Sequence, residues 1–339
     1  MDVAILFALI VGLLLLGVPI AVALGFSSMM FLLVLSDTSL ASIAQTLFQA
    51  MAGHYTLLAI PFFILASSFM STGGVAKRII RFSIACVGHF HGGLAIAGLF
   101  ACMMFAALSG SSPATVVAIG GIVIAGMRKV GYSKEFAAGV ICNAGTLGIL
   151  IPPSIVMVVY ASSVDVSVGR MFLAGVIPGL MAGLMLMIAI YVIARMRKMP
   201  KGEFAGFREI FMSGLEAGWG LFLIVIILGG IYGGVFTPTE AAAVAAVYAF
   251  FISTFIYRDM GPLAGKAKAK SLREFVSNLP RYLAETVVYF IPALFHKDTR
   301  KTLFEAGKLT ITLLFIIANA QILKHVLTDE QVPQQIPNA

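Results

Sequence analysis

The chain has 339 residues, of which 60% are hydrophobic and only 11% are charged, and its formal net charge is +8. Soluble domains usually hold about 25% charged and about 45–50% apolar residues, and one water-soluble core cannot bury this apolar excess. The composition excludes a disordered chain, a nucleic-acid-binding protein and a secreted disulfide scaffold. Long continuous apolar runs, instead of alternating segments, predict an all-α polytopic membrane protein.

The positive charge is a topology signal, because it lies in short segments between apolar runs. Four clusters share this property: Lys77, Arg78 and Arg81; Arg128, Lys129 and Lys134; Arg195, Arg197, Lys198 and Lys201; Arg258, Lys266, Lys268 and Lys270. The positive-inside rule places all four clusters in the cytoplasm. An even number of crossings must therefore separate successive clusters.

The first segment, residues 1–72, is predicted to hold the first scaffold helices. Residues 3–35 carry no charge and would be about 49 Å long as a helix, too long for one span of a core about 30 Å thick. Gly17-Val18-Pro19 divides this run into two short spans. Another span follows at 55–70, which leaves residues 36–54 and the N-terminus outside.

Residues 73–93 are predicted to form a cytoplasmic interfacial arm helix, because basic residues are interspersed with apolar ones. The alternative is a charged face at the end of an ordinary helix. Residues 94–127 follow as two apolar arms of about 21–23 Å each, joined by Ser109-Gly110-Ser111-Ser112-Pro113. Because both flanks are cytoplasmic, a re-entrant hairpin is the economical solution, and two short spans with an outer turn are the alternative.

Residues 136–163 are predicted to be a broken helix. Between Cys142 and Ser154 the chain has an Asn, two Gly and a Pro-Pro pair, which together predict an unwound centre with free carbonyls. The hairpin and the broken helix are grouped as transport elements, residues 94–163. A transmembrane helix at 171–194 closes the first repeat.

Residues 217–260 begin a second repeat. One predicted span crosses the membrane outward and ends at Phe236. The chain then reverses direction in a turn at Thr237-Pro238-Thr239-Glu240, and a second span crosses back to the cytoplasm. Thr237 or Thr239 with Glu240 is typical of a helix N-cap. The proline turn is similar to the one at Gly17-Val18-Pro19, and opposite orientations of the two turns indicate an inverted repeat. Chance similarity of two proline turns is the alternative.

Residues 261–308 form a basic cytoplasmic insertion. From 262 to 308, nine Lys and Arg against four Asp and Glu give +5, and the segment is interpreted as lying on the membrane with interfacial helices, a lipid-binding role being an alternative. Residues 309–339 hold the last span, from Leu309 to Leu323, and a polar tail.

The candidate site combines the hairpin tip with the broken helix. The tip offers hydroxyls, carbonyls and a helix N-terminus, and a cage of such oxygens suits a hard cation such as Na⁺. Neither segment contains Asp, Glu, Lys or Arg, whereas proton coupling usually needs a titratable group within the membrane. The pattern thus favours Na⁺ over H⁺. A Ser/Gly-rich surface for helix packing is the alternative.

Five motifs in order resemble the large membrane subunit of the tripartite ATP-independent periplasmic (TRAP) transporters of C4-dicarboxylate type. They are the stretches 17–21, 58–66, 109–115, 143–154 and 233–241. The resemblance extends from the start to about residue 260 and more weakly over 309–336. It implies an inverted-repeat ion-transporter-like fold and location in the bacterial inner membrane.

The resemblance also implies sodium-coupled uptake of a small organic anion by an elevator mechanism, with a small TRAP membrane subunit and a periplasmic substrate-binding protein as partners. It implies no cofactor besides Na⁺ as coupling ion and no catalytic residue. Carried over by motif, the Na⁺ site would comprise Ser109, Ser111, Ser112, Asn143, Gly145 and Thr146. The residues lining the substrate would be Ser112, Pro113, Thr115, Asn143, Pro152 and Pro153.

The chain ends before the second hairpin and second broken helix that the family pattern contains. We therefore expect a C-terminally truncated permease with an incomplete second repeat. A transport-incompetent fragment or an assembly scaffold is the alternative function. A channel would need a continuous polar stripe, and an intramembrane enzyme would need a paired nucleophile and base; neither pattern is visible in the sequence.

Overall fold

The computed structural model describes residues 2–35, 40–53, 55–266 and 278–329, and these residues are almost entirely helical. Within them, five helical segments are long and apolar enough to cross a membrane, and a bent pair makes a sixth. The five are Tyr55–Thr72, Val168–Met196, Phe207–Tyr232, Pro238–Ile256 and Lys297–Thr328, and the bent pair is Lys134–Leu150 with Ile155–Ser163. The all-α polytopic prediction is confirmed.

The chain forms two compact units, residues 1–57 with 308–339, and residues 58–307. The first unit contains α1 (Asp2–Leu15), α2 (Ile20–Leu35), α3 (Leu40–Ala52) and the later part of α16 (Lys297–Asp329). The long N-terminal apolar run breaks at Gly17, which has a φ of 82°, as the sequence predicts. α3 lies within the 36–54 stretch, which we had left without an element.

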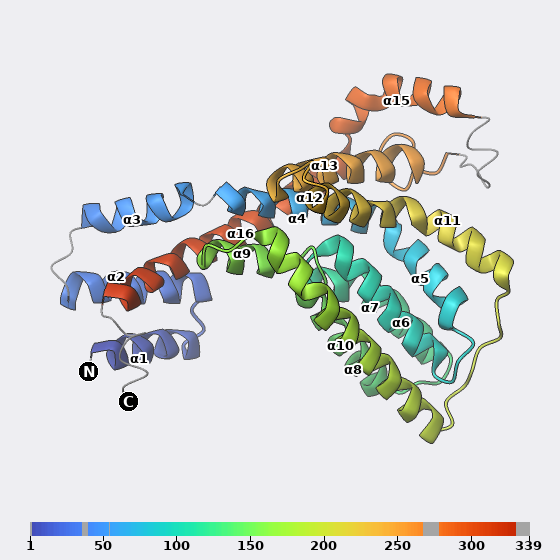
Figure 1. Ribbon diagram of the computed structural model, residues 1–339, viewed down its shortest axis with the longest axis horizontal. Coiled ribbons are helices and arrows are strands. Elements are labelled where there is room, and N and C mark those ends of the chain that lie inside the picture. Colours follow the sequence, from blue (N-terminus) through green and yellow to red (C-terminus); the bar gives the residue numbers. More distant parts are fainter. Residues whose placement is uncertain (1, 36–39, 54, 267–277, 330–339) are drawn as a thin grey trace. The chain divides into compact units, whose positions relative to one another are not determined.

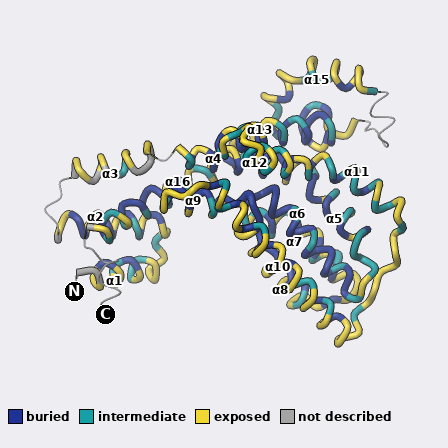
Figure 2. The backbone as a smooth tube through the Cα atoms, in the orientation of Figure 1, coloured by how far each residue is buried: buried dark blue, intermediate teal, exposed yellow. Residues whose placement is uncertain are grey.

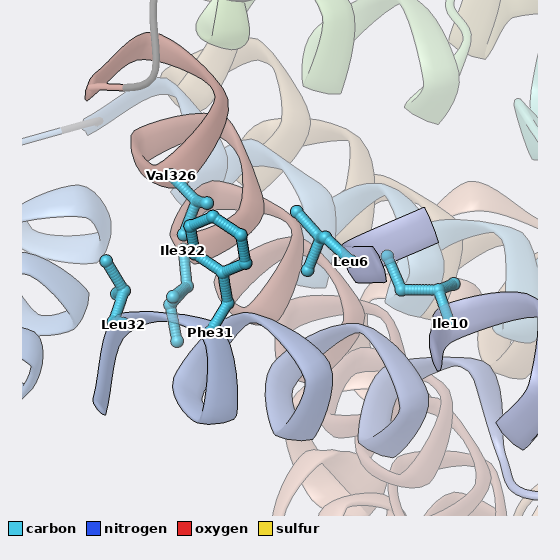
Figure 3. Packing of buried hydrophobic residues seen from close by; sticks show 6 residues of the cluster. All are labelled: Leu6, Ile10, Phe31, Leu32, Ile322 and Val326. Carbon is cyan, nitrogen blue, oxygen red and sulfur yellow. The ribbon is translucent and has the colours of Figure 1, made fainter. Parts of the chain in front are cut away.

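The core of the first unit is an apolar cluster, shown in Figure 3. Leu6 and Ile10 come from α1, Phe31 and Leu32 from α2, and Ile322 and Val326 from α16. Helices α2 and α16 approach closely beside this cluster. The distance shows this, since a Cβ on Gly25 would lie only 1.9 Å from Oδ1 of Asn319. Small residues permit such close approach of membrane helices.

The second unit begins at Leu58, the last residue of η1 (Tyr55–Leu58), and its first helix is α4 (Ala59–Thr72), which lies along α13 (Pro238–Phe251). α13 offers α4 a side of alanines, five of which are buried. The rings of Phe69 and Phe250 meet edge to face at 5.4 Å, and the Ser253 hydroxyl donates to the Phe69 carbonyl at 2.9 Å. The pair is therefore closely packed and hydrogen-bonded across its interface.

The middle of the second unit is a bundle around α6. Its helices are α5 (Val75–Val87), α6 (Gly93–Ser109), α7 (Ser112–Lys129), α8 (Lys134–Leu150), α9 (Ile155–Ser163) and α10 (Val168–Met196). α6 contacts α5, α7, α8 and α10, and nearly all its residues are buried (Figures 1 and 2). Gly98 and Gly120 let the helices approach, since a Cβ at either would clash with Val123 or Ile141.

The next span begins earlier than the sequence predicts. α11 (Phe207–Ile224), the π-helical η2 (Val225–Gly229) and α12 (Gly230–Tyr232) form one continuous segment. α13 then starts with a full capping box, in which Glu240 N–H donates to Thr237 and Thr237 N–H donates to Glu240. The predicted N-cap is confirmed, with Thr237 as the capping residue.

Ion pairs join several helices of this unit, and the residues that form them are here named the charged end. On α5, Arg78 pairs with Asp259 at 2.6 Å, and its guanidinium lies 3.8 Å from the ring centroid of Tyr257. Arg81 pairs with Glu209 and Glu216 of α11, each at 2.8 Å. Beyond the π-helical η3 (Ile252–Ile256), Arg258 pairs with Glu285 of α15 (Leu279–Leu294).

α16 begins at Lys297, before the predicted start of the last span at Leu309, and the point at which this helix enters the membrane stays a prediction. No proline interrupts residues 297–329, and the charged side chains of the first turns are exposed and include the pair Lys301–Glu305. Charges mark where a helix leaves the hydrocarbon, not where its backbone ends. The part of the predicted insertion with Lys268, Lys270, Arg273 and Glu274, and tail residues 330–339, lie outside the described residues.

Candidate functional site

The hairpin tip is a tight turn between α6 and α7. α6 ends at Ser109, Gly110 takes a left-handed φ of 59°, and Ser111 is extended before α7 begins at Ser112 with Pro113 in its first turn. Glycine suits the left-handed position after a helix, and proline suits the first helical turn. Neither arm is among the helices long and apolar enough to span. Entry of this hairpin from the cytoplasm remains a prediction.

The tip hydroxyls form a closed ring of hydrogen bonds. The Ser111 N–H donates to Ser109 Oγ at 3.3 Å, and Thr115 Oγ1 donates to the Ser111 carbonyl at 2.9 Å. Ser109 Oγ and Thr115 Oγ1 lie 2.9 Å apart, so a Ser109 donor completes the ring. Because each hydroxyl oxygen has two lone pairs and accepts one bond here, each keeps one for another ligand.

The tip packs against the break between α8 and α9. The Ile155 N–H donates to the Gly110 carbonyl at 3.1 Å. A Cβ on Gly110 would lie 2.7 Å from the Pro153 carbonyl oxygen, and a Cβ on Gly148 would lie 2.9 Å from the Ser112 nitrogen. Two interruptions that are far apart in the chain thus meet backbone to backbone.

The predicted unwound centre is shorter than the sequence suggests. α8 stays helical through Leu150, and the break covers only residues 151–154, with a bend of 42°. Pro152 and Pro153 have no N–H, so the carbonyls of Gly148 and Ile149 lack their helical donors. Asn143, Gly145 and Gly148 each lower the stability of a helix by only about 1 kcal/mol. Packing of α8 against its neighbours offsets this cost, so the helix continues through these residues.

The predicted site residues fall into two groups. The first group is buried or half-buried at the tip and the break, and it comprises Ser109, Ser111, Ser112, Thr115, Gly145, Pro152 and Pro153. The second group is exposed and comprises Pro113, Asn143 and Thr146. Gly145 belongs to the tip contact, since its Cβ would lie 3.7 Å from the Ser112 carbonyl oxygen. The structure therefore brings together the serines of the tip, Gly145 and the proline pair.

Asn143 and Thr146 lie on another side of α8. The Asn143 amide donates to the Gly139 carbonyl at 2.8 Å, and the Thr146 hydroxyl donates to the Asn143 carbonyl at 2.7 Å. Asn143 lines a mainly apolar cavity of about 310 Å³ between α6, α8 and α10, together with Glu135. The structure does not place this amide against the tip hydroxyls.

Ser154 is a residue that our site prediction left out. It precedes α9, is fully buried, and its Oγ has no hydrogen-bond partner within the part of the chain that the structure describes. Its Cα would lie 3.4 Å from a Cβ on Gly110. A serine directly after a proline pair at a helix restart is the sequence signal that could have found it.

The tip and the break offer oxygen atoms without charge. Residues 94–127 and 136–163, which hold the tip and the break, contain no Asp, Glu, Lys or Arg, and the charges of α7 and α8 lie at the ends of these helices away from the tip and the break. Hydroxyl lone pairs at Ser109 and Thr115, the hydroxyl of Ser154 and the carbonyls freed by the prolines lie at this junction. Oxygen donors of this kind suit a hard cation.

The fold and this junction define a multi-pass α-helical membrane protein. Residues 7–339 match the family model described as "Tripartite ATP-independent periplasmic transporter, DctM component". The chain belongs to this family of TRAP transporter large permeases. It is accordingly a transport protein and not an enzyme.

Curated relatives cover nearly the whole chain. The C4-dicarboxylate TRAP transporter large permease protein DctM of Vibrio cholerae is 70% identical over 99% of this chain and 71% of its own length. Its namesake from Pseudomonas aeruginosa is 54% identical over 93% of this chain and 65% of its own length. The 2,3-diketo-L-gulonate TRAP transporter large permease protein YiaN of Escherichia coli is 36% identical over 99% and 71%. The chain thus spans 65–71% of the length of these relatives.

Proposed function

We propose that this chain serves sodium-coupled uptake of a C4-dicarboxylate across the bacterial inner membrane, as the large permease subunit of a binding-protein-dependent TRAP system. The observation that carries the proposal is the uncharged junction of the hairpin tip with the broken helix, joined by the Ile155–Gly110 hydrogen bond at 3.1 Å. Broken helices at mid-membrane commonly form the sites of secondary transporters.

Sodium as the coupling ion is supported by the chemistry of this junction. The candidate ligands are Ser109, Ser111 and Ser112 of the tip with Gly145, to which the buried Ser154 is added. They supply hydroxyl and carbonyl oxygens, and no group at the junction titrates near neutral pH. Asn143 and Thr146 join this site only if α8 rotates or its exposed side is covered by another part of the transporter.

A small organic anion as substrate is supported by the names of the relatives and by the N-terminus of α7. The free N–H groups of Ser112 and its neighbours make that helix start attractive to a carboxylate. Ser112, Pro113, Thr115, Asn143, Pro152 and Pro153 remain the proposed substrate-lining residues. The Thr115 hydroxyl already donates to the Ser111 carbonyl within the hydroxyl ring. We therefore propose that Thr115 orients the tip.

An elevator movement would carry the hairpin and the broken helix as one body. The backbone contact between Gly110 and Ile155 and the close approach of Gly148 to the tip support joint movement. The proposed partners, a small membrane subunit and a periplasmic substrate-binding protein, complete the system.

The test is uptake of a labelled C4-dicarboxylate by cells that lack their own carrier and express the chain with the small subunit and the binding protein. Replacing external Na⁺ with choline at equal ionic strength should abolish uptake. The control is an added K⁺ pulse, which should change nothing. Uptake that is unchanged in choline would contradict the coupling ion, and uptake that needs no binding protein would contradict the TRAP assignment.

A further inference from the structure

α15 presents an apolar face outward from the second unit. The exposed residues of this outer face are Leu279, Leu283, Val287, Val288, Ile291 and Leu294. Val287, near its middle, is 78% exposed, and Phe295 continues the face just beyond the helix. The sequence places these residues within one half of the helical circumference.

The opposite face of α15 is polar and holds the helix to the unit. Glu285 pairs with Arg258, whose side chain is only 3% exposed, and Arg258 also lies over the ring of Tyr282 at 4.3 Å. Lys266 donates to the Tyr289 hydroxyl at 3.3 Å. At the edge of the outer face, Phe290 is 37% exposed and stacks on Phe251 with ring centroids 5.9 Å apart. The helix is thus fixed in one rotational setting about its axis.

This arrangement is the reverse of a helix on a water-soluble protein, which turns its apolar stripe inward. An exposed apolar face of this width needs apolar surroundings. α15 has 16 residues, about 24 Å of helix, which is too short for a hydrocarbon core about 30 Å thick. A helix with these properties lies in the plane of the membrane interface.

Basic side chains bracket the outer face. At the start of α15, Arg281 is 68% exposed and keeps free donors beside its bond to Glu285. Directly after α15, Lys297, Arg300 and Lys301 are exposed at the beginning of α16. The cytoplasmic leaflet carries anionic lipid and attracts such residues. Both ends of the apolar face therefore match lipid headgroups that carry negative charge.

We propose that the outer face of α15 and its bracketing basic residues bind anionic phospholipids of the cytoplasmic leaflet, with acyl chains on Val287 and its neighbours and phosphates on Lys297, Arg300 and Lys301. The site is distinct from the transport junction. It depends on the location of the chain in the inner membrane and not on the transported ion or substrate.

The experiment uses the full chain in vesicles of equal parts phosphatidylglycerol and phosphatidylcholine. The variant Trp219→Phe removes the single tryptophan, and Val287→Trp places a reporter on the outer face. Bromine is carried on the chains of one lipid class at a time, so the composition stays constant. Quenching by brominated phosphatidylglycerol should be roughly threefold stronger than by brominated phosphatidylcholine.

The charge part of the proposal has its own variants. Lys297→Gln with Arg300→Gln and Lys301→Gln should equalise quenching by the two lipids while leaving it present. Removing three basic residues elsewhere, Arg195→Gln with Arg197→Gln and Lys198→Gln, should leave the preference intact. A reporter at Lys134→Trp, at the polar start of α8, should be quenched by neither lipid.

Two results would overturn the proposal. Equal quenching by both lipids in the parent reporter would mean that the face meets acyl chains without choosing anionic headgroups. No quenching by either lipid would mean that water or another protein surface, such as a second copy or a partner subunit, covers the outer face. Correct folding of each variant is checked by its elution as a single species in detergent.

Discussion

At the hairpin tip, distant segments are joined by hydroxyls, carbonyls and glycine contacts, whereas at the charged end they are joined by ion pairs. The Ile155–Gly110 hydrogen bond links α6 to α9 without a formal charge. Arg78–Asp259 and Arg258–Glu285 link helices by full charges. Placing a charged side chain within the hydrocarbon core has a high free-energy cost, and this cost is much lower at the membrane interface. The same unit therefore joins distant segments by neutral oxygen chemistry at the tip and by charge chemistry at the charged end.

The largest expected effect lies at the tip. Gly110→Ala adds a Cβ 2.7 Å from the Pro153 carbonyl oxygen at a left-handed φ of 59°. We expect a loss of about 3 kcal/mol in the free energy of unfolding, measured with denaturant in detergent micelles, because conformational strain and overpacking add. The matched control, Gly234→Ala, has φ 69° and no neighbour within 4 Å, and should lose about 1 kcal/mol. If Gly110→Ala and Gly234→Ala lost the same free energy of unfolding, the close contact between the tip and the break would not contribute to the effect.

The second effect tests the charged end. Glu285→Gln removes a carboxylate that pairs with the buried guanidinium of Arg258, and we expect a loss of about 2 kcal/mol in the same unfolding measurement. Arg281→Gln removes the exposed partner of the same carboxylate and should cost less than about 0.5 kcal/mol. If both variants lost the same amount, the burial of Arg258 would not determine the strength of this pair.

The same pair predicts a pH dependence. Burial alone would raise the pKa of Glu285, but the hydrogen bond from Arg281 and the charge of Arg258 outweigh it, and the pKa lies below its ordinary value. A carboxyl with a lowered folded pKa contributes stability above its unfolded pKa, about 4.3, and loses it as pH falls through the folded value. The stability difference between the parent chain and Glu285→Gln should therefore shrink below about pH 4. A difference that stays constant down to pH 3 would contradict this pairing.

A smaller effect tests the hydroxyl ring. Thr115→Val removes the donor to the Ser111 carbonyl and the partner of Ser109, and should cost about 1 kcal/mol. If Na⁺ binds at the tip as proposed, NaCl should raise the melting temperature of the parent chain relative to KCl, and Thr115→Val should remove this rise. Ser162→Ala is the control, because the buried Ser162 hydroxyl has no partner in the described part of the chain; it should keep the Na⁺ response. A full Na⁺ response in Thr115→Val would separate the ring from ion binding.

The smallest effect is expected for an exposed ion pair. Arg81 is 47% exposed and pairs with Glu209 and Glu216 of α11. Arg81→Gln should lower the free energy of unfolding by less than about 1 kcal/mol, and 1 M salt should remove most of the difference. A loss as large as that of Glu285→Gln would mean that solvent does not screen this end of the unit.

Local signals allowed much of the fold to be predicted from the sequence. Gly17, the proline pair at 152–153 and the Thr237-Glu240 cap act on their own turns, and each break or helix start falls where these residues predict it. The extent of the break was overestimated, because the cost of Asn143 and its neighbouring glycines in a helix is small. α16 begins before the apolar run that predicts the last span, because a helix does not end where its surface becomes charged.

The candidate site was predictable in its parts but not in its assembly. Each interruption is visible along the chain, yet the pairing of Gly110 with Ile155 depends on the packing of α6, α7 and α8. The direction of Asn143 likewise depends on which side of α8 meets the hairpin. Ser154 becomes notable only once its hydroxyl is buried without a partner.

The sequence by itself determined the class of the protein, the positions of its helix breaks and the absence of charge from residues 94–127 and 136–163, because composition, proline, glycine and charge act locally. Only the tertiary structure decided which breaks meet, which hydroxyls close a ring, and that α15 turns its polar face to Arg258 and its apolar face outward. These features depend on contacts between residues far apart in the chain, which no local pattern encodes.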